Sequence, residues 1–263
     1  MKGTVYLVGA GPGAPDLLTL RAARLLQQAD IVFHDALLHP ETLALAANAA
    51  RVAVGKRCGK LSTAQRFINK QLIDAAARYR TVVRLKGGDP MLFGRAQEEI
   101  DALRAAGIRV AVVPGVSAAF AASADLGQSL TERGVSRSAV FVTPRVGAGE
   151  TAHDWARPAA AADTAVLYMA SQQAQAIRDG LLAAGLPASR PAVFVEHASL
   201  PSRRILPTRL GDLEHAAAQL GEGPALLVLG EVYEVIVAQA ERATAEPRRS
   251  TPDLRNAPIL RSA

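Results

Sequence analysis

The sequence predicts an α/β fold built from two α/β domains. Short runs rich in valine, leucine and isoleucine alternate with runs of helical periodicity, and two glycine-rich loops begin where apolar runs end. The first loop, Gly9–Gly13, follows Thr4–Val8. The second loop, Lys86–Arg95, follows Val82–Leu85. Because adjacent glycines let the backbone approach a ligand closely, the two loops predict a cleft for a small molecule.

The apolar runs are expected to form strands, and the runs between them helices. The strand candidates are short, as in buried parallel strands, and lie at Val5–Val8, Ile31–His34, Arg51–Val54, Val82–Leu85, Val110–Val113, Val140–Thr143, Ala165–Met169, Ala192–Val195 and Ala225–Leu229. The helix candidates carry apolar residues at i, i+3 and i+4 and lie at Asp16–Gln28, Thr63–Tyr79, Arg95–Ala106, Ser117–Leu126, Gln172–Leu182 and Arg209–Leu220. The stretch Ala156–Ala162 is interrupted by Arg157 and Pro158, which predicts a surface connection with little helix.

A domain boundary is expected in the turn sequence Val113–Ser117 or in the polar stretch Gly127–Arg137 just beyond it. We therefore predict an N-terminal α/β domain over residues 1–115 and a C-terminal α/β domain over residues 116–244. Residues 245–263 hold three prolines and four arginines with little apolar periodicity. This composition predicts a flexible basic tail.

Composition and length narrow the class of protein. With 263 residues, of which 49% are hydrophobic, the chain can bury a sizeable core. No apolar run reaches the roughly 18 to 20 residues that span a bilayer, and no signal-peptide core follows Met1, so we expect a cytoplasmic protein without a membrane partner. Cys58 is the only cysteine, which excludes an intramolecular disulfide and a cysteine-based metal site. No metal is predicted.

The charge balance favours an anionic small molecule over nucleic acid. The chain has 30 Lys and Arg against 24 Asp and Glu, a formal net charge of +6. Aromatic residues make up only 4% of the sequence, and no helix-turn-helix, zinc finger or basic-zipper pattern is present. We therefore predict no nucleic-acid partner. A strongly anionic substrate would explain the same arginines.

The first glycine loop has two alternative interpretations from its residues alone. Gly9, Gly11 and Ala14 satisfy a loose dinucleotide-binding pattern, which would indicate a dinucleotide-dependent oxidoreductase. Pro12 and Pro15, however, remove two backbone N–H groups from the loop that would have to bind pyrophosphate. A purely structural turn is the second alternative.

Six short phrases of the sequence are informative when they are taken together and in order. They are Val8–Gly13, Gly55–Arg57, Val83–Pro90, Phe93–Arg95, Val113–Ala118 and Gly223–Leu226. In this order they resemble the tetrapyrrole methyltransferases, and the phrase Arg-Leu-Lys-Gly-Gly-Asp-Pro at Arg84–Pro90 is the most specific. The resemblance extends from about residue 3 to residue 235. It implies two α/β domains of the tetrapyrrole methylase type, with the cofactor in the cleft between them.

The resemblance also implies a reaction. The methyl donor would be S-adenosylmethionine, which becomes S-adenosylhomocysteine, and two methyl groups would pass to pyrrole carbons C2 and C7 of uroporphyrinogen III. The product would be precorrin-2, which serves sirohaem or cobalamin biosynthesis. A pyrrole methylated on carbon is a cationic ring that must lose a proton, so a positioned acid–base group is expected. The family further implies a homodimer.

Particular residues stand at the family's functional positions. Asp35 stands where the family has a candidate base, and Lys56 where it has a candidate proton donor. Judged by residue type alone, a helix-terminal acid and a solvated lysine are the alternatives. The predicted cofactor-binding residues are Pro12, Gly87, Gly88, Asp89, Leu92, Ser117, Ala118, Met169, Ala198, Pro224, Ala225 and Leu226. Since Asp89 is expected to contact the ligand rather than support the fold, Asp89→Ala should weaken cofactor binding and leave thermal unfolding nearly unchanged.

The sequence departs from the family pattern at four places that bear on the substrate. Ala36 replaces an arginine, Leu61 lies where a histidine is usual, Glu132 replaces a histidine, and Pro144 begins the departure from a Thr-Gly-His phrase. These departures leave open a methyltransferase that acts on a later precorrin, and a non-catalytic binding protein is a further alternative.

Two arginines lie beside these departures. Arg133 and Arg145 could bind acetate or propionate groups through paired N–H donors. A solvated surface arginine is the alternative for each of them.

Overall fold

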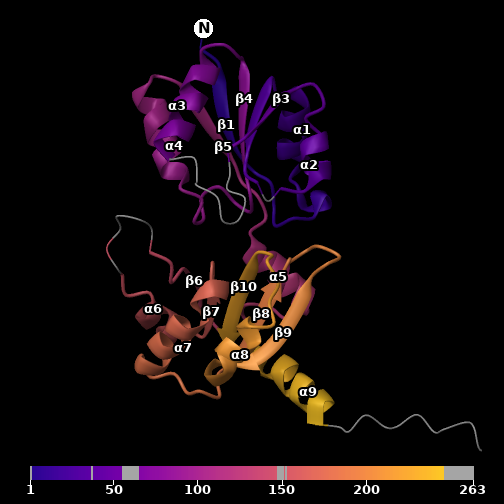
Figure 1. Cartoon of the computed structure of the whole chain (residues 1–263), viewed down its shortest axis with the longest axis vertical. Helices are drawn as coiled ribbons and strands as arrows, with labels where there is room; N and C mark the ends of the chain where they lie inside the picture. The colour runs from indigo at the N-terminus through magenta and orange to yellow at the C-terminus, as the bar shows by residue number, and fades with distance from the viewer. Residues whose placement is uncertain (1, 37, 55–64, 147–150, 152, 246–263) are drawn as a thin grey trace, which may run out of the picture.

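Two five-stranded sheets organise the chain, one from each half of the sequence (Figure 1). The computed structural model of the chain describes residues 2–36, 38–54, 65–146, 151 and 153–245. Helices pack on both faces of each sheet. The predicted α/β fold class is therefore confirmed.

The first sheet is parallel throughout, in the order β3-β2-β4-β1-β5. Its strands are β1 (Thr4–Gly9), β2 (Ile31–His34), β3 (Ala50–Ala53), β4 (Thr81–Lys86) and β5 (Arg109–Val113). The helices of this half are η1 (Pro15–Leu17), α1 (Leu20–Gln28), α2 (Pro40–Ala44), α3 (Gln65–Ala76) and α4 (Ala96–Ala105). Because the strands run the same way, the loops after β1, β2 and β4 meet at one edge of the sheet.

The two faces of this sheet carry different helices. Val5, Leu7 and Phe33 pack with α3 and α4, whereas their neighbours in sequence, such as Val8 and Val32, pack with α1. This alternation is the period of two that a strand imposes on its side chains. Burial of each large apolar side chain stabilises the fold by about 1.5–3 kcal/mol. The sheet is thus held by apolar packing on both faces.

The second sheet is mixed, in the order β6-β7-β10-β8-β9. Its strands are β6 (Ala139–Val142), β7 (Thr164–Leu167), β8 (Pro191–Glu196), β9 (Arg204–Arg209) and β10 (Ala225–Gly230). Only β6 and β7 are parallel among its described pairs. The helices are α5 (Ala118–Leu126), α6 (Ala156–Ala161), η2 (Ser171–Gln173), α7 (Ala174–Ala183), η3 (Leu210–Asp212), α8 (Leu213–Ala217), η4 (Glu231–Tyr233) and α9 (Glu234–Ala245). The expectation of buried parallel strands was wrong for β8 and β10, because a strand buried on both faces has the same apolar sequence in either direction.

Several elements were not predicted from the sequence. β9 contains Pro207, which lacks an N–H donor and is tolerated because β9 is an edge strand. The stretch predicted as a surface connection forms α6, since alanine has high helix propensity and Pro158 lies in the first turn. The short α2 and the C-terminal α9 were also missed.

The chain passes from the first sheet to the second between β5, which ends at Val113, and α5, which begins at Ala118. Ser117 caps α5, accepting a hydrogen bond from the backbone N–H of Ala119, and the buried alanines of α5 pack on the second sheet. α9 ends at Ala245, so that residue of the predicted tail is helical, and residues 246–263 lie outside the described residues. Within the described ranges, no helix combines the length and apolar character needed to cross a bilayer.

Candidate active site between the two sheets

The two glycine loops meet backbone to backbone. The Gly88 N–H donates to the Gly11 carbonyl at 2.7 Å, and the Gly11 N–H donates to the Gly88 carbonyl at 3.2 Å. Gly88 has φ +65°, a conformation that glycine adopts without steric strain. A Cβ added at Gly87 or Gly88 would meet no described atom within 4 Å. The loop after β4 therefore presents bare backbone to open space, as a ligand-binding loop would.

Asp89 holds this loop in place. Its Oδ1 accepts a hydrogen bond from the Met91 N–H at 2.8 Å, and its Oδ2 accepts one from the Gly115 N–H at 3.0 Å. Both carboxylate oxygens thus have backbone donors. The Gly115 hydrogen bond connects the loop after β4 to the segment between β5 and α5, and the Met91 hydrogen bond lies within the loop. Asp89 therefore has a structural role in the loops that was not predicted from the sequence.

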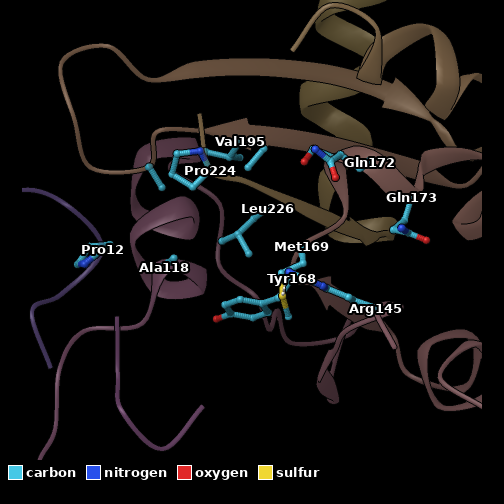
Figure 2. Close-up of a pocket in the computed structure, with 13 residues that line it drawn as sticks. Pro12, Ala118, Arg145, Tyr168, Met169, Gln172, Gln173, Val195, Pro224 and Leu226 are labelled. Atoms are coloured by element: carbon cyan, nitrogen blue, oxygen red, sulfur yellow. Dashed lines mark hydrogen bonds between the residues drawn. The ribbon is translucent and has the colours of Figure 1, made fainter. Parts of the chain in front are cut away.

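A cavity of about 350 Å³ lies beside these loops (Figure 2). Its volume is in the usual range for small-molecule sites. The lining residues come from the loop after β1, from α5, from the segments after β6 and β7, from β8 and the segment after it, and from β10 and the residue before it. They are Pro12, Ala118, Arg145, Tyr168, Met169, Ser171, Gln172, Gln173, Val195, Ala198, Pro224, Ala225 and Leu226.

One part of the cavity wall is polar and is formed by the segments that follow β6 and β7. Arg145 is the only charged side chain among the described lining residues, and its Nη1 donates to the Met169 Sδ at 3.8 Å. The Tyr168 hydroxyl lies 2.5 Å from the Ser117 Oγ. Burial raises the pKa of Tyr168, which keeps the phenol protonated at neutral pH. The lining residues that follow η2 in the sequence are mostly small and apolar, as Figure 2 shows.

Asp35 lies at the carboxyl edge of the first sheet, just after β2. Its Oδ1 accepts a hydrogen bond from Arg84 Nη2 at 2.6 Å, and 35% of its side chain is exposed. No described residue donates to its Oδ2. Oδ1 is therefore fixed by a charge-assisted hydrogen bond, and Oδ2 has no donor among the described residues.

The tetrapyrrole (corrin/porphyrin) methylase family model matches residues 4–214. This chain is a tetrapyrrole methylase. The uroporphyrinogen-III C-methyltransferase of Pseudomonas aeruginosa is 42% identical over 240 residues, which cover 91% of this methylase and 98% of that relative. A siroheme synthase of a Psychrobacter species is 46% identical over 236 residues, 89% of this chain but 48% of the relative. The methylase thus spans about half the length of the siroheme synthases it matches.

Solved structures resemble most of the methylase. A uroporphyrin-III C-methyltransferase from Thermus thermophilus, crystallised with S-adenosylhomocysteine, has a TM-score of 0.78 and 41% identity, covering 89% of this chain and 100% of that one. A cobalt precorrin-4 methyltransferase has a TM-score of 0.77 and 26% identity, covering 87% of this chain and 95% of that one. The family assignment replaces the dinucleotide interpretation of Gly9–Gly13.

The structure brings together most, but not all, of the predicted site residues. Seven of the predicted cofactor residues line the cavity of the methylase: Pro12, Ala118, Met169, Ala198, Pro224, Ala225 and Leu226. The others do not line it, namely Gly87, Gly88, Asp89, Leu92 and Ser117. Of the two catalytic candidates, Asp35 is described and Lys56 lies outside the described residues.

Sequence reasoning missed several lining residues. Tyr168 precedes Met169, and Ser171–Gln173 follow it within four residues, so nearness to Met169 at the end of the predicted strand Ala165–Met169 was the signal that could have found them. Val195 was assigned only to a strand. Among the described residues of the methylase, no group of three or more His, Cys, Asp or Glu side chains is arranged to hold a metal ion.

Proposed function

We propose that this protein is an S-adenosylmethionine-dependent methyltransferase that methylates uroporphyrinogen III at C2 and C7 and yields precorrin-2. The observation that carries the proposal is the cavity, since seven residues at the family's cofactor positions converge on it from separate segments. The Pseudomonas aeruginosa relative and the Thermus thermophilus structure with S-adenosylhomocysteine support the same substrate and cofactor. The product would serve sirohaem or cobalamin biosynthesis.

The residues present fit S-adenosylmethionine. Ala118, Val195 and Leu226 offer a small apolar surface suited to a flat base, and Gln172 and Gln173 offer amide groups to polar atoms. The bare backbone at Gly87–Gly88 leaves room for a ligand beside the cavity. When bound, S-adenosylmethionine supplies a methyl group that its sulfonium already activates.

The chain's own contribution is then to place the substrate and to take a proton. The cavity walls hold the two reactants in contact, and such orientation can supply roughly 7–11 kcal/mol of rate enhancement. The Oδ2 of Asp35, to which no described residue donates, accepts the proton that the cationic pyrrole ring must lose after its carbon is methylated. Lys56 is proposed as the proton donor on the strength of the family resemblance.

Substrate carboxylates need cationic partners, and Arg145 is suited to this task. It is the charged residue at the cavity, and its described contacts include a thioether sulfur but no carboxylate. We assign it to an acetate or propionate of the macrocycle. Arg133, which is also exposed, does not line the cavity.

A methyltransferase for a later precorrin is the second candidate. The likeness to a cobalt precorrin-4 methyltransferase favours it, as do the departures at Ala36, Leu61, Glu132 and Pro144. The proposal also includes a division into domains over residues 1–115 and 116–244, which the two sheets support. A homodimer and a cytoplasmic location remain predictions from the sequence.

The direct test is a mass measurement. Purified protein incubated anaerobically with uroporphyrinogen III and S-adenosylmethionine should yield a product heavier by two methyl groups, and NMR of the isolated product should place them on C2 and C7. Binding of S-adenosylhomocysteine without any change in the mass of uroporphyrinogen III would contradict the substrate assignment. Methylation of a later precorrin instead would support the second candidate.

A further inference from the structure

A row of charged side chains continues the apolar face of the first sheet toward Asp35. On β4, Val82 belongs to the core beneath α3 and α4, and Arg84 and Lys86 follow it at intervals of two. On the neighbouring β2, Phe33 lies opposite Arg84 in the register, and Asp35 follows Phe33 at the same interval. Since side chains two apart share a face, the apolar core passes into a charged cluster at the carboxyl edge.

Glu99 of α4 is the centre of this cluster. Its side chain is 0% exposed. Its Oε1 accepts hydrogen bonds from Arg84 Nε at 3.2 Å and from Gln65 Nε2 at 3.1 Å. Lys86 Nζ lies 3.1 Å from both carboxylate oxygens. Glu99 therefore joins α3, α4 and β4 through one buried carboxylate.

Arg84 is fixed at three points. Its Nε donates to Glu99, its Nη1 donates to the Leu85 carbonyl at 3.0 Å, and its Nη2 donates to Asp35 Oδ1 at 2.6 Å. A guanidinium is planar and rigid, so bonds at two of its nitrogens set the direction of the third. The contacts of Nε with Glu99 and of Nη1 with the Leu85 carbonyl thus determine where Nη2 points.

We propose that Glu99 is a positioning residue, which orients the Asp35 carboxylate through Arg84 for proton removal. This inference rests on the proposed function, in which Asp35 is the base. Glu99 is buried, and its hydrogen bonds with described residues go to Gln65, Arg84 and Lys86, none of which lines the cavity, so it acts through these neighbours.

The cluster is poorly explained as a device for stability. Burial and the nearby charge of Arg84 lower the pKa of Lys86, because the buried site disfavours its charged form. Buried ion pairs often contribute no more than apolar residues of similar size, because their charges must be removed from water. The two cations and Glu99 are nevertheless arranged so that one guanidinium nitrogen reaches Asp35, a partly exposed acid at the carboxyl edge of the first sheet.

A double-mutant cycle tests the proposal. The variants are Glu99→Gln, Asp35→Asn and the two combined, and each is assayed with uroporphyrinogen III and S-adenosylmethionine. Calorimetric titration with S-adenosylhomocysteine gives the concentration of folded protein, and kcat is calculated from that concentration. We expect Glu99→Gln to lower kcat by between about tenfold and a hundredfold, since a small misplacement of a reacting group has this effect. The Kd of S-adenosylhomocysteine should stay within threefold of wild type. In the Asp35→Asn background, Glu99→Gln should lower kcat no further.

Two further variants make the cycle decisive. Glu234→Gln removes a glutamate of α9 that pairs with Arg209 of β9. Neither residue lines the cavity, so this variant should leave kcat unchanged. If Glu99→Gln does not fold, it is combined with Lys86→Gln, which removes both charges of the pair between Glu99 and Lys86. This double variant should show the same loss of kcat.

The outcomes separate the two proposals. A kcat within threefold of wild type in folded Glu99→Gln overturns the positioning role. An equal loss in the wild-type and Asp35→Asn backgrounds overturns it as well, because Glu99 would then act independently of Asp35. If Asp35→Asn alone keeps the wild-type kcat, the proposed base is wrong, and the positioning role is wrong with it.

Discussion

The carboxylate of Asp89 is joined to the backbone of Gly115 by a hydrogen bond of 3.0 Å that spans two loops. The chain is packed tightly at this point, because a Cβ on Gly115 would lie 2.3 Å from the Gly88 carbonyl oxygen. The loop after β4 and the segment leading to α5 therefore act as one unit. Since α5 carries Ala118 into the cavity, Asp89 connects the binding loop of the first sheet to the cavity of the second.

Asp89→Ala is expected to lower the free energy of unfolding by about 1–3 kcal/mol, because the Gly115 N–H, in a part-buried contact, and the exposed Met91 N–H both lose a charged acceptor. It should also weaken the binding of S-adenosylhomocysteine. Urea denaturation and calorimetry measure the two effects. Asp89→Asn keeps one oxygen acceptor and should fall between wild type and alanine in both. An unchanged free energy of unfolding in Asp89→Ala would contradict the structural role and would support the expectation from the sequence that Asp89 only contacts the ligand.

Gly88→Ala tests whether the open space at the loop after β4 belongs to the ligand. Gly88 and Gly127 form a matched pair, with φ of +65° and +62° and no described atom within 4 Å of an added Cβ. Alanine at either position should lower the free energy of unfolding by about 1–2 kcal/mol through left-handed strain. Only Gly88→Ala should weaken the binding of S-adenosylhomocysteine, measured by calorimetry. Equal affinity in the two variants would show that no ligand occupies this space.

The strands that position the site could be read from the sequence, because short apolar runs bounded by glycine have few other structures available. Ile31–His34 forms β2 with the predicted bounds, and β4 extends its candidate by one residue at each end. The direction of β8 and β10 could not be read, since burial on both faces removes the alternation that distinguishes antiparallel strands. β9 was hidden by Pro207, which is acceptable only at a sheet edge that the sequence does not reveal.

The site could be predicted where glycine-rich backbone forms it. It was harder to predict where side chains that are far apart in the sequence meet in the fold. Pro12 and Leu226 line the same cavity although they lie far apart in sequence, and only the family phrases brought them together. Nothing of this kind pointed to Glu99, which looked like one more charged residue of an amphipathic helix. Its partners Arg84 and Lys86 carried a local signal, because charges at alternate positions of a buried strand need a buried counter-charge.

Arg145→Gln is expected to raise the KM for uroporphyrinogen III about tenfold or more, because a hydrogen bond to a charged group is worth about 1.5–3 kcal/mol. Steady-state kinetics at saturating methyl donor measures this. The Kd of S-adenosylhomocysteine should stay within threefold. Arg133→Gln is the matched control, since Arg133 is exposed but lies away from the cavity, and it should leave the KM unchanged. A weakened affinity for S-adenosylhomocysteine with an unchanged KM would instead assign Arg145 to the methyl donor.

Tyr233 gives a prediction about stability and pH. Its side chain is 0% exposed, and its hydroxyl has no hydrogen-bond partner among the described residues. Removing this unsatisfied group in Tyr233→Phe should raise the free energy of unfolding by about 1 kcal/mol at neutral pH, measured by urea denaturation. The same change at the half-buried Tyr79 should have a smaller effect.

The effect of Tyr233→Phe should also depend on pH. Burial raises the pKa of Tyr233 above the ordinary value of 10.0, so at alkaline pH the unfolded chain loses a proton that the folded chain keeps. The folded state then binds more protons, and the stability of the wild type falls as the pH rises beyond about 10. Phenylalanine cannot ionise, so the advantage of Tyr233→Phe over wild type should grow from pH ~8 to pH ~11. An advantage that stays constant over this range would show that Tyr233 ionises equally in both states.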